Sequence, residues 1–201
     1  LFNERAVLYY EKENYKEALK DALTSIEIDS TVADFYVTLA DAYLGLGKLQ
    51  PSLQSLDNAI ALDPKNMQAL IKLAEINIIF REYKKALGYI DDVIKLDELE
   101  PKAYFLRGVV LLENQDTLLA IRNFQKAIDV DQDYFDAHLQ LGMLYAQKKN
   151  KLAVDYFNNA LNIKPDNTDV SYYLAMYYQE TGGYDEAIKL YEGLFLKDPQ
   201  F

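Results

Sequence analysis

The chain has 201 residues and a formal net charge of −11, from 32 acidic and 21 basic side chains. This acidic balance disfavours nucleic acid and anionic lipid as partners, because both are bound through clusters of Lys and Arg. The chain has no cysteine, which excludes disulfides, thiolate catalysis and cysteine-bound zinc. It also contains no apolar run of about 18 residues, so direct membrane insertion is not expected.

Taken in chain order, the sequence predicts pairs of amphipathic helices that recur about every 34 residues. Residues 36–64, YVTLADAYLGLGKLQPSLQSLDNAIALDP, show the plan most clearly, with two helices on either side of a short glycine-containing turn. We expect a single array over residues 1–201 with repeats at 1–32, 33–66, 67–100, 101–134, 135–167 and 168–201.

Small side chains at fixed places carry this alignment. They recur midway along each first helix, at Ala6, Ala40, Ala74, Gly108, Gly142 and Ala175. They recur again early in each second helix, at Ala18, Ser52, Ala86, Ala120, Ala153 and Ala187. Small residues on facing surfaces let two helices approach closely, so each repeat is predicted to form an antiparallel helical hairpin. The apolar stripe of one hairpin is too broad to bury alone, so neighbouring hairpins must stack.

Three of the second helices are expected to stop at a proline, because proline lacks the backbone donor that a helix interior needs. These prolines are Pro64, Pro165 and Pro199.

This pattern resembles the tetratricopeptide repeat family over essentially the whole chain, with the second and sixth repeats fitting best. The resemblance implies an all-α, right-handed superhelical solenoid of antiparallel helix pairs, whose first helices line a concave groove. It also implies a protein or peptide partner. Arg5 and Arg107 depart from the pattern where Leu is usual, and His138 and Ser171 depart from it where a bulky aromatic residue is usual.

Catalysis finds little support in the sequence. The only histidine, His138, falls at a helix position where the repeat places a core or half-buried residue. A hydrolase triad or a metal site normally needs more imidazole or thiol than this. We therefore expect that the chain is not an enzyme and holds no cofactor and no metal.

Four aspartates in the run DVDQDYFD, residues 129–136, superficially resemble a calcium loop. Tyr134 and Gln140 stand where an EF-hand needs Gly and a bidentate Glu, so the motif fails. We expect instead a turn between repeats in which Asp caps the following helix. The lysines among residues 148–151 are likewise expected to belong to a solvated turn.

The resemblance places one face of each first helix in the groove, and most residues at those positions are apolar. An exposed apolar band of this length usually marks a binding surface. The alternative is that winding of the array buries part of the band against itself. The candidate peptide-binding residues are Val37, Asp41, Leu44, Ile71, Glu75, Ile78, Phe105, Val109, Leu112, Leu139, Met143, Tyr172 and Met176.

Chaperone-binding members of the family hold a C-terminal carboxylate with a set of Lys, Asn and Arg side chains. The corresponding positions here are occupied by Asn3, Val7, Thr38, Gln68 and Lys72, so this carboxylate clamp is absent. An apolar or amphipathic peptide is the expected ligand.

Solenoids usually close with a polar capping helix. The last helix predicted here carries several large apolar residues instead, so we expect it to expose an apolar face. Tyr191, Leu194 and Phe195 are the candidate residues for self-association through this end. Leu194 is bulky where a following repeat would prefer a small residue.

Three functions remain open at this point. The first is a protein–protein interaction module that binds an extended or amphipathic peptide in its groove. The second is a scaffold segment of a larger, envelope- or secretion-type complex that acts through its ends and edges. The third is the regulatory arm of an enzyme. The chain starts at Leu1 without a basic-then-apolar leader, and the cytoplasm and periplasm both remain open as locations.

Overall fold

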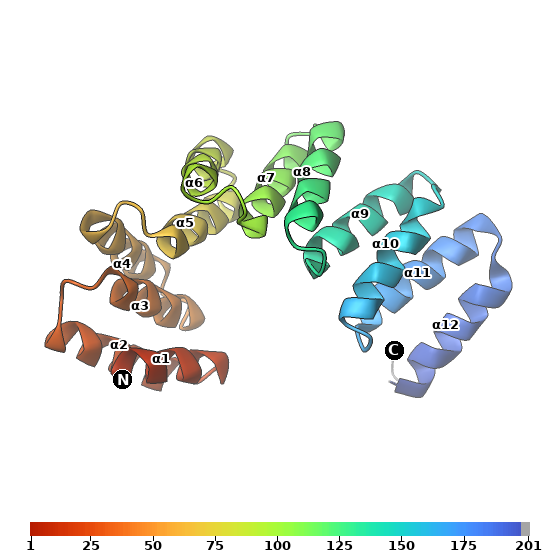
Figure 1. Ribbon diagram of the computed structural model, residues 1–201. Helices are drawn as coiled ribbons and strands as arrows, with labels where there is room; N and C mark the ends of the chain where they lie inside the picture. Colours follow the sequence, from red (N-terminus) through yellow and green to blue (C-terminus); the bar gives the residue numbers. More distant parts are fainter. Residues whose placement is uncertain (198–201) are drawn as a thin grey trace. The chain divides into compact units, whose positions relative to one another are not determined.

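The computed structural model describes residues 1–197, and all the regular structure in this range is α-helical. Successive helices form antiparallel hairpins, and a further hairpin follows along the chain each time (Figure 1). The residues group into two compact units, Leu1–Glu98 and Leu99–Phe201. Pro199, one of the three expected helix stops, lies outside the described residues.

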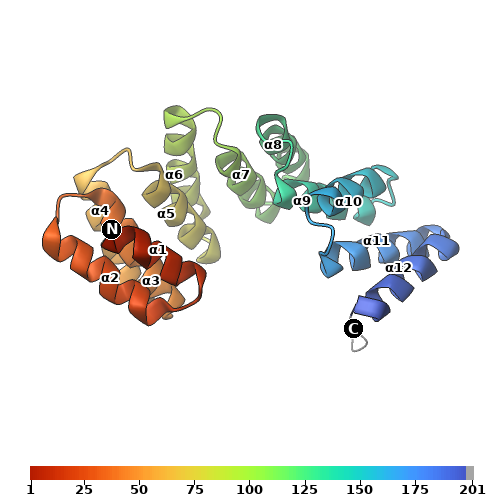
Figure 2. The same ribbon diagram turned by 60° about the horizontal axis from the view of Figure 1, so that its bottom comes forward.

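The first unit contains three hairpins. Their helices are α1 (Phe2–Glu11), α2 (Tyr15–Ile28), α3 (Ala33–Gly45), α4 (Leu49–Leu62), α5 (Met67–Ile79) and α6 (Tyr83–Leu96). The second unit also contains three hairpins. Their helices are α7 (Pro101–Glu113), α8 (Thr117–Val130), α9 (Phe135–Gln147), α10 (Leu152–Ile163), α11 (Thr168–Thr181) and α12 (Tyr184–Lys197). Figure 2 shows the two helices of the last hairpin, α11 and α12, side by side.

The turn inside each hairpin contains one residue in the left-handed region of backbone space. Glycine fills that place in the second and sixth hairpins, as Gly47 and Gly182. The other hairpins hold a larger residue there, at Glu13, Arg81, Gln115 and Lys149. Non-glycine residues rarely adopt a positive φ, so the packing of the two helices overrides local preference at these four turns. Lys148, Lys149 and Lys151 are exposed, as expected for a solvated turn.

Four of the turns between hairpins begin with an aspartate. α2, α4, α6 and α8 each end directly before an Asp in extended conformation. The Asp131 carboxylate accepts a hydrogen bond from the backbone N–H of Asp133 at 3.0 Å, and Asp29 and Asp63 do the same two residues on. An Asx turn of this kind offers the backbone an alternative to continuing the helix.

These aspartates therefore close their own helix. The expectation that Asp in the run 129–136 caps the following helix is wrong, because α9 begins after Tyr134 and has no side-chain cap. Capping does occur at Asn66 and Asn167, whose side chains accept from Ala69 N–H and Val170 N–H, each at 2.9 Å. Proline adds to the stop signal in two hairpins, since α4 ends at Leu62 and α10 at Ile163, shortly before Pro64 and Pro165.

The predicted small residues lie at the helix contacts. All twelve positions in the two small-residue series are buried. In two hairpins the small residue is glycine and the residue opposite it is phenylalanine. A Cβ added at Gly108 would lie 2.5 Å from the Phe124 ring, and one added at Gly142 would lie 2.6 Å from the Phe157 ring. The helices of these hairpins are thus fitted to each other around a buried aromatic ring.

The first hairpin is held by a buried carboxylate. Asp21 on α2 is almost fully buried and accepts two hydrogen bonds from Arg5 on α1, from Nε at 2.5 Å and from Nη2 at 2.9 Å. The hydrogen bond from Arg5 lowers the pKa of Asp21, and burial opposes that change. Arg5, which departs from the family pattern, therefore has a structural partner inside its own repeat.

Asp21→Asn should make the fold less sensitive to acid. Because the folded-state pKa of Asp21 lies below the unfolded value, its ion pair stabilises the fold above the unfolded pKa and is lost as pH falls through the folded pKa. At pH 7 we expect the variant to melt about 2–4 °C below the wild type. The gap should close towards pH 3. Thermal melts followed by circular dichroism at both pH values measure it, and a gap that is the same at both would contradict this role.

Candidate functional site

The candidate groove residues of the first unit lie on α3 and α5, and part of their surface is used within the fold. Val37 and Ile71 are only 8% and 4% exposed. Val37 belongs to the buried cluster that joins α3, α4 and α5, against which Leu44 also packs. Leu44 and Ile78 are half-buried. This part of the predicted apolar band therefore offers a partner little free surface.

Asp41, one of the two acidic candidates of the first unit, forms an ion pair with a lysine. Lys72 Nζ on α5 is 2.6 Å from the Asp41 carboxylate on α3, and both side chains are largely covered. Tyr10 on α1 is close enough that Asp41 contributes to the increase of its pKa, although burial is the larger cause. This ion pair links two successive first helices of the first unit and places a charged pair among its apolar candidates.

The candidates on α7 in the second unit support the core. Phe105 is half-buried, and its ring lies 5.6 Å from that of Phe124 and 5.5 Å from that of Tyr134. Val109 and Leu112 are half-buried against the same cluster. A polar substitution at Phe105 would thus disturb packing as well as any binding surface.

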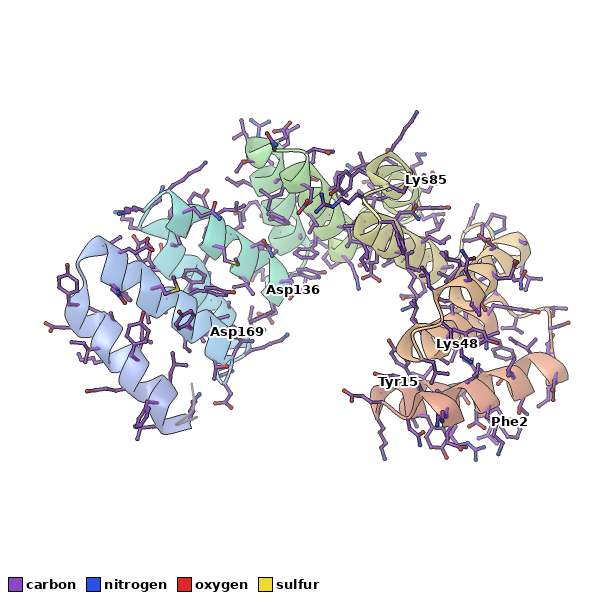
Figure 3. All side chains as sticks on the ribbon, turned by 180° about the vertical axis from the view of Figure 1, so that it is seen from behind. Phe2, Tyr15, Lys48, Lys85, Asp136 and Asp169 are labelled. Carbon is purple, nitrogen blue, oxygen red and sulfur yellow. The ribbon has the colours of Figure 1, made fainter. Side chains whose placement is uncertain are left out.

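Two of the four candidates on α9 and α11 line a cavity of about 270 Å³. Met143 and Met176 both line it, while Leu139 packs against the buried cluster next to it. Tyr172 and Met176 are each 37% exposed, in contrast to Val37 and Ile71 in the first unit. Asp136 and Asp169 mark the N-terminal ends of the two helices that form this surface (Figure 3).

Several residues of this cavity were not predicted. The remaining lining residues are Ala146, Gln147, Phe157, Tyr173, Tyr177 and Glu180. The run SYYLAMYYQE, residues 171–180, carries the signal that could have found some of them, because Tyr173, Tyr177 and Glu180 follow one another at helical spacing. Phe157 comes from a second helix, so a rule that reads only first helices misses it. Two of the lining residues, Met143 and Met176, carry thioether side chains, which adapt readily to irregular partners.

The three candidate residues for self-association on α12 differ in how far their side chains are exposed. Leu194 is buried, and the Tyr191 hydroxyl donates to Gln179 Oε1 at 2.9 Å. Only Phe195 of the three is well exposed, together with Ile188 and Leu196 on the same helix. Contrary to the expectation, Leu194 offers little surface for contact with another chain, because its side chain is buried.

His138 is buried, as the repeat pattern predicted, and its Nε2 lies 2.9 Å from the carbonyl oxygen of Gln132. Within residues 1–197, no three His, Cys, Asp or Glu side chains are grouped so that they could hold a metal ion. No helix in the same range is long and apolar enough to cross a bilayer.

Tandem antiparallel helix pairs with small residues at the contacts define an α-helical repeat protein. Sequence profiles described as tetratricopeptide repeat match residues 37–101 and 105–168, and another of the same description matches residues 144–201. The chain belongs to the tetratricopeptide repeat family. Proteins of this family are protein–protein interaction modules or scaffolds, typically without catalytic activity, and they assemble into complexes with protein partners.

Among curated proteins, the chain is similar to the DnaJ homolog subfamily C member 7 homolog of Dictyostelium discoideum. The two are 27% identical over 127 residues, which cover 57% of this chain and 24% of the relative. The chain spans only 23% to 32% of the length of the first three curated relatives that it matches.

Among solved structures, the chain is similar to PilW, described as a widely conserved type IV pilus biogenesis factor. The TM-score is 0.86 at 14% identity, over 98% of this chain and 92% of PilW. It is also similar to YrrB, described as a TPR protein with an unusual peptide-binding site. That TM-score is 0.60 at 19% identity, over 89% of this chain and 92% of YrrB. At these identities the likeness shows the fold alone.

Proposed function

We propose that the chain is a non-catalytic interaction module that holds an extended or amphipathic peptide against the inner face of its first helices. The cavity between α9 and α11 carries this proposal, because it joins two predicted residues, Met143 and Met176, with aromatic side chains. Ligand sites are typically concave and mostly apolar, with a few polar groups at the rim. Gln147 and Glu180 supply such groups here.

The candidate residues of the second unit leave more exposed surface than those of the first unit. At equivalent repeat positions, Val37 and Ile71 are buried whereas Tyr172 is exposed. A peptide would therefore be anchored in the second unit. YrrB, which has the same fold and whose description names a peptide-binding site, is in keeping with this use. We expect an affinity in the micromolar range, about −8 kcal/mol.

A second candidate is a scaffold that acts through its end. Ile188 and Phe195 on α12 are more than half exposed. Val154 and Leu161 hold the same repeat positions on α10, where they pack against a cluster that contains residues of α11. The exposed pair on α12 thus corresponds to positions that a neighbouring helix covers elsewhere in the chain.

Three substitutions separate the two functions, each replacing an exposed apolar side chain with glutamate. Met176→Glu changes the cavity, Phe195→Glu changes the end of α12, and Leu118→Glu on α8 is the control at 63% exposure. The probe is a peptide selected on the wild-type protein from a phage-displayed library of random 12-residue peptides. Fluorescence anisotropy gives its affinity, and light scattering gives the mass of each variant.

Met176→Glu is expected to weaken the peptide at least about tenfold, because a buried methionine contact is worth roughly 1.5–3 kcal/mol. Phe195→Glu and Leu118→Glu should leave it unchanged. An unchanged affinity of the peptide for the Met176→Glu variant would contradict the proposed peptide-binding function. A wild-type oligomer that only Phe195→Glu dissociates would favour the scaffold.

A further inference from the structure

A second cavity lies in the second unit, and it shares no lining residue with the cavity around Met143 and Met176. Its volume is about 530 Å³. The residues come from the end of α8, the turn after it, the start of α9 and the second half of α10. They are Ile128, Asp129, Gln132, Asp133, His138, Asn159, Asn162 and Ile163. None of them is among the candidate peptide-binding residues.

The walls of this cavity are rich in hydrogen-bond acceptors. Asp129 and Asp133 contribute carboxylates, and Asn159 and Asn162 contribute amides from the opposite helix. Asp129 accepts one long hydrogen bond, at 3.3 Å, from Gln125. Within residues 1–197 no partner is found for the Asp133 carboxylate, which leaves it available to a ligand.

His138 adds a second and independent observation. The residue is 4% exposed and lines the cavity. Its Nε2 is 2.9 Å from the Gln132 carbonyl oxygen, and because a carbonyl only accepts, Nε2 carries the proton. In the neutral ring Nδ1 is then an acceptor, and it has no hydrogen-bond partner among the described residues. A buried acceptor without a donor is costly and calls for a missing group.

The nearest cation in the sequence does not fill this need. Lys164 directly follows Ile163, but its ammonium lies 4.0 Å from the centroid of the Phe135 ring. No ion pair between Lys164 and either aspartate is found in the part of the chain that the structure describes. A metal ion is also disfavoured, since the two carboxylates are not joined by a third suitable ligand within residues 1–197.

We propose that this cavity binds an arginine side chain of a partner protein. A guanidinium group is a cation with five N–H donors in a planar fork and no acceptor, which matches carboxylates and amide oxygens on opposite walls. The cavity has room for the side chain together with water. The site is independent of peptide binding on the inner face.

The probes for this site are three blocked amino acids. N-acetyl-arginine methylamide carries the guanidinium, the citrulline analogue has the same shape without charge, and the lysine analogue has the charge without the fork. Each is titrated at constant ionic strength into ¹⁵N-labelled protein, and the side-chain amide signals of Asn159 and Asn162 are followed by NMR. We expect the arginine compound to bind at least about fivefold more tightly than the citrulline compound, which is what one partly exposed charged contact is worth. It should also bind more tightly than the lysine compound.

A matched pair of variants tests the assignment to the cavity. Asp133→Asn removes a lining carboxylate, whereas Asp136→Asn removes an exposed carboxylate nearby on the first turn of α9 that does not line it (Figure 3). Both change the net charge equally. Asp133→Asn should weaken the arginine compound about fivefold, and Asp136→Asn less than twofold. Equal effects of the two variants, or equal affinity for arginine and citrulline, would overturn the proposal. Lysine binding as tightly as arginine would also overturn it.

Discussion

Phe157→Ala is expected to lower the free energy of unfolding by about 3–5 kcal/mol. The Phe157 ring, on α10, is fully buried and lies against Gly142 on α9. Because residue 142 is glycine, α9 contributes no side chain at this contact. Gly142 has no side chain that could fill the space that the ring leaves. The cost therefore includes both the lost apolar burial and the cavity that remains. Urea denaturation followed by circular dichroism measures the change.

Phe195→Ala is the control for this substitution. The chemical change is identical, but Phe195 is 59% exposed on α12. We expect its effect to stay within about 0.5 kcal/mol. A loss at Phe157 no larger than that at Phe195 would show that the aromatic ring does not hold the fifth hairpin together.

Gly142→Ala is expected to destabilise the protein by about 1–3 kcal/mol, although alanine is the better helix former. The new methyl group would lie 2.6 Å from two carbons of the Phe157 ring, which is too close for contact without movement. The gain in helix propensity is only about 0.5–1 kcal/mol. Overpacking is the larger effect, so the sign is unfavourable.

The opposite sign is expected where the space is open. Gly193 on α12 has nothing within 4 Å of an added Cβ, so Gly193→Ala should stabilise the protein by about 0.5–1 kcal/mol. Both variants are measured by the same urea denaturation. A stabilising Gly142→Ala would mean that the Phe157 ring moves aside at little cost.

The second hairpin suggests how the Gly142→Ala variant is rescued. There Ala40 and Leu56 occupy the same two repeat positions and lie in one buried cluster. Adding Phe157→Leu to Gly142→Ala recreates that smaller pair. The double variant should be less destabilised than the sum of the single ones, by about 0.5–3 kcal/mol. Strict additivity would indicate that the two residues are not fitted to each other.

The sequence by itself determined the repeat and the helix pairs. Small residues at Ala40, Gly108 and Ala153 are buried as predicted because a close helix contact tolerates no other kind of side chain. His138 is buried, in line with the core or half-buried position that the repeat predicted for it. Helix ends were predicted less well. The helix ends were predicted from proline alone. In the structure Asp29, Asp63 and Asp131 end their helices with a local hydrogen bond, whether or not a proline follows.

Only the tertiary structure decided which of the residues at equivalent repeat positions are exposed to solvent. Val37, Ile71 and Tyr172 share one repeat position, yet the first two are buried and the third is exposed. The exposed fraction of such a residue depends on its size and on how far the next helix covers it, and neither follows from the spacing of apolar residues. The acceptor-rich cavity was hidden for a similar reason. Asp129 and Asn159 are far apart in the chain, and they face one another because α8 and α10 belong to successive hairpins that stack through α9.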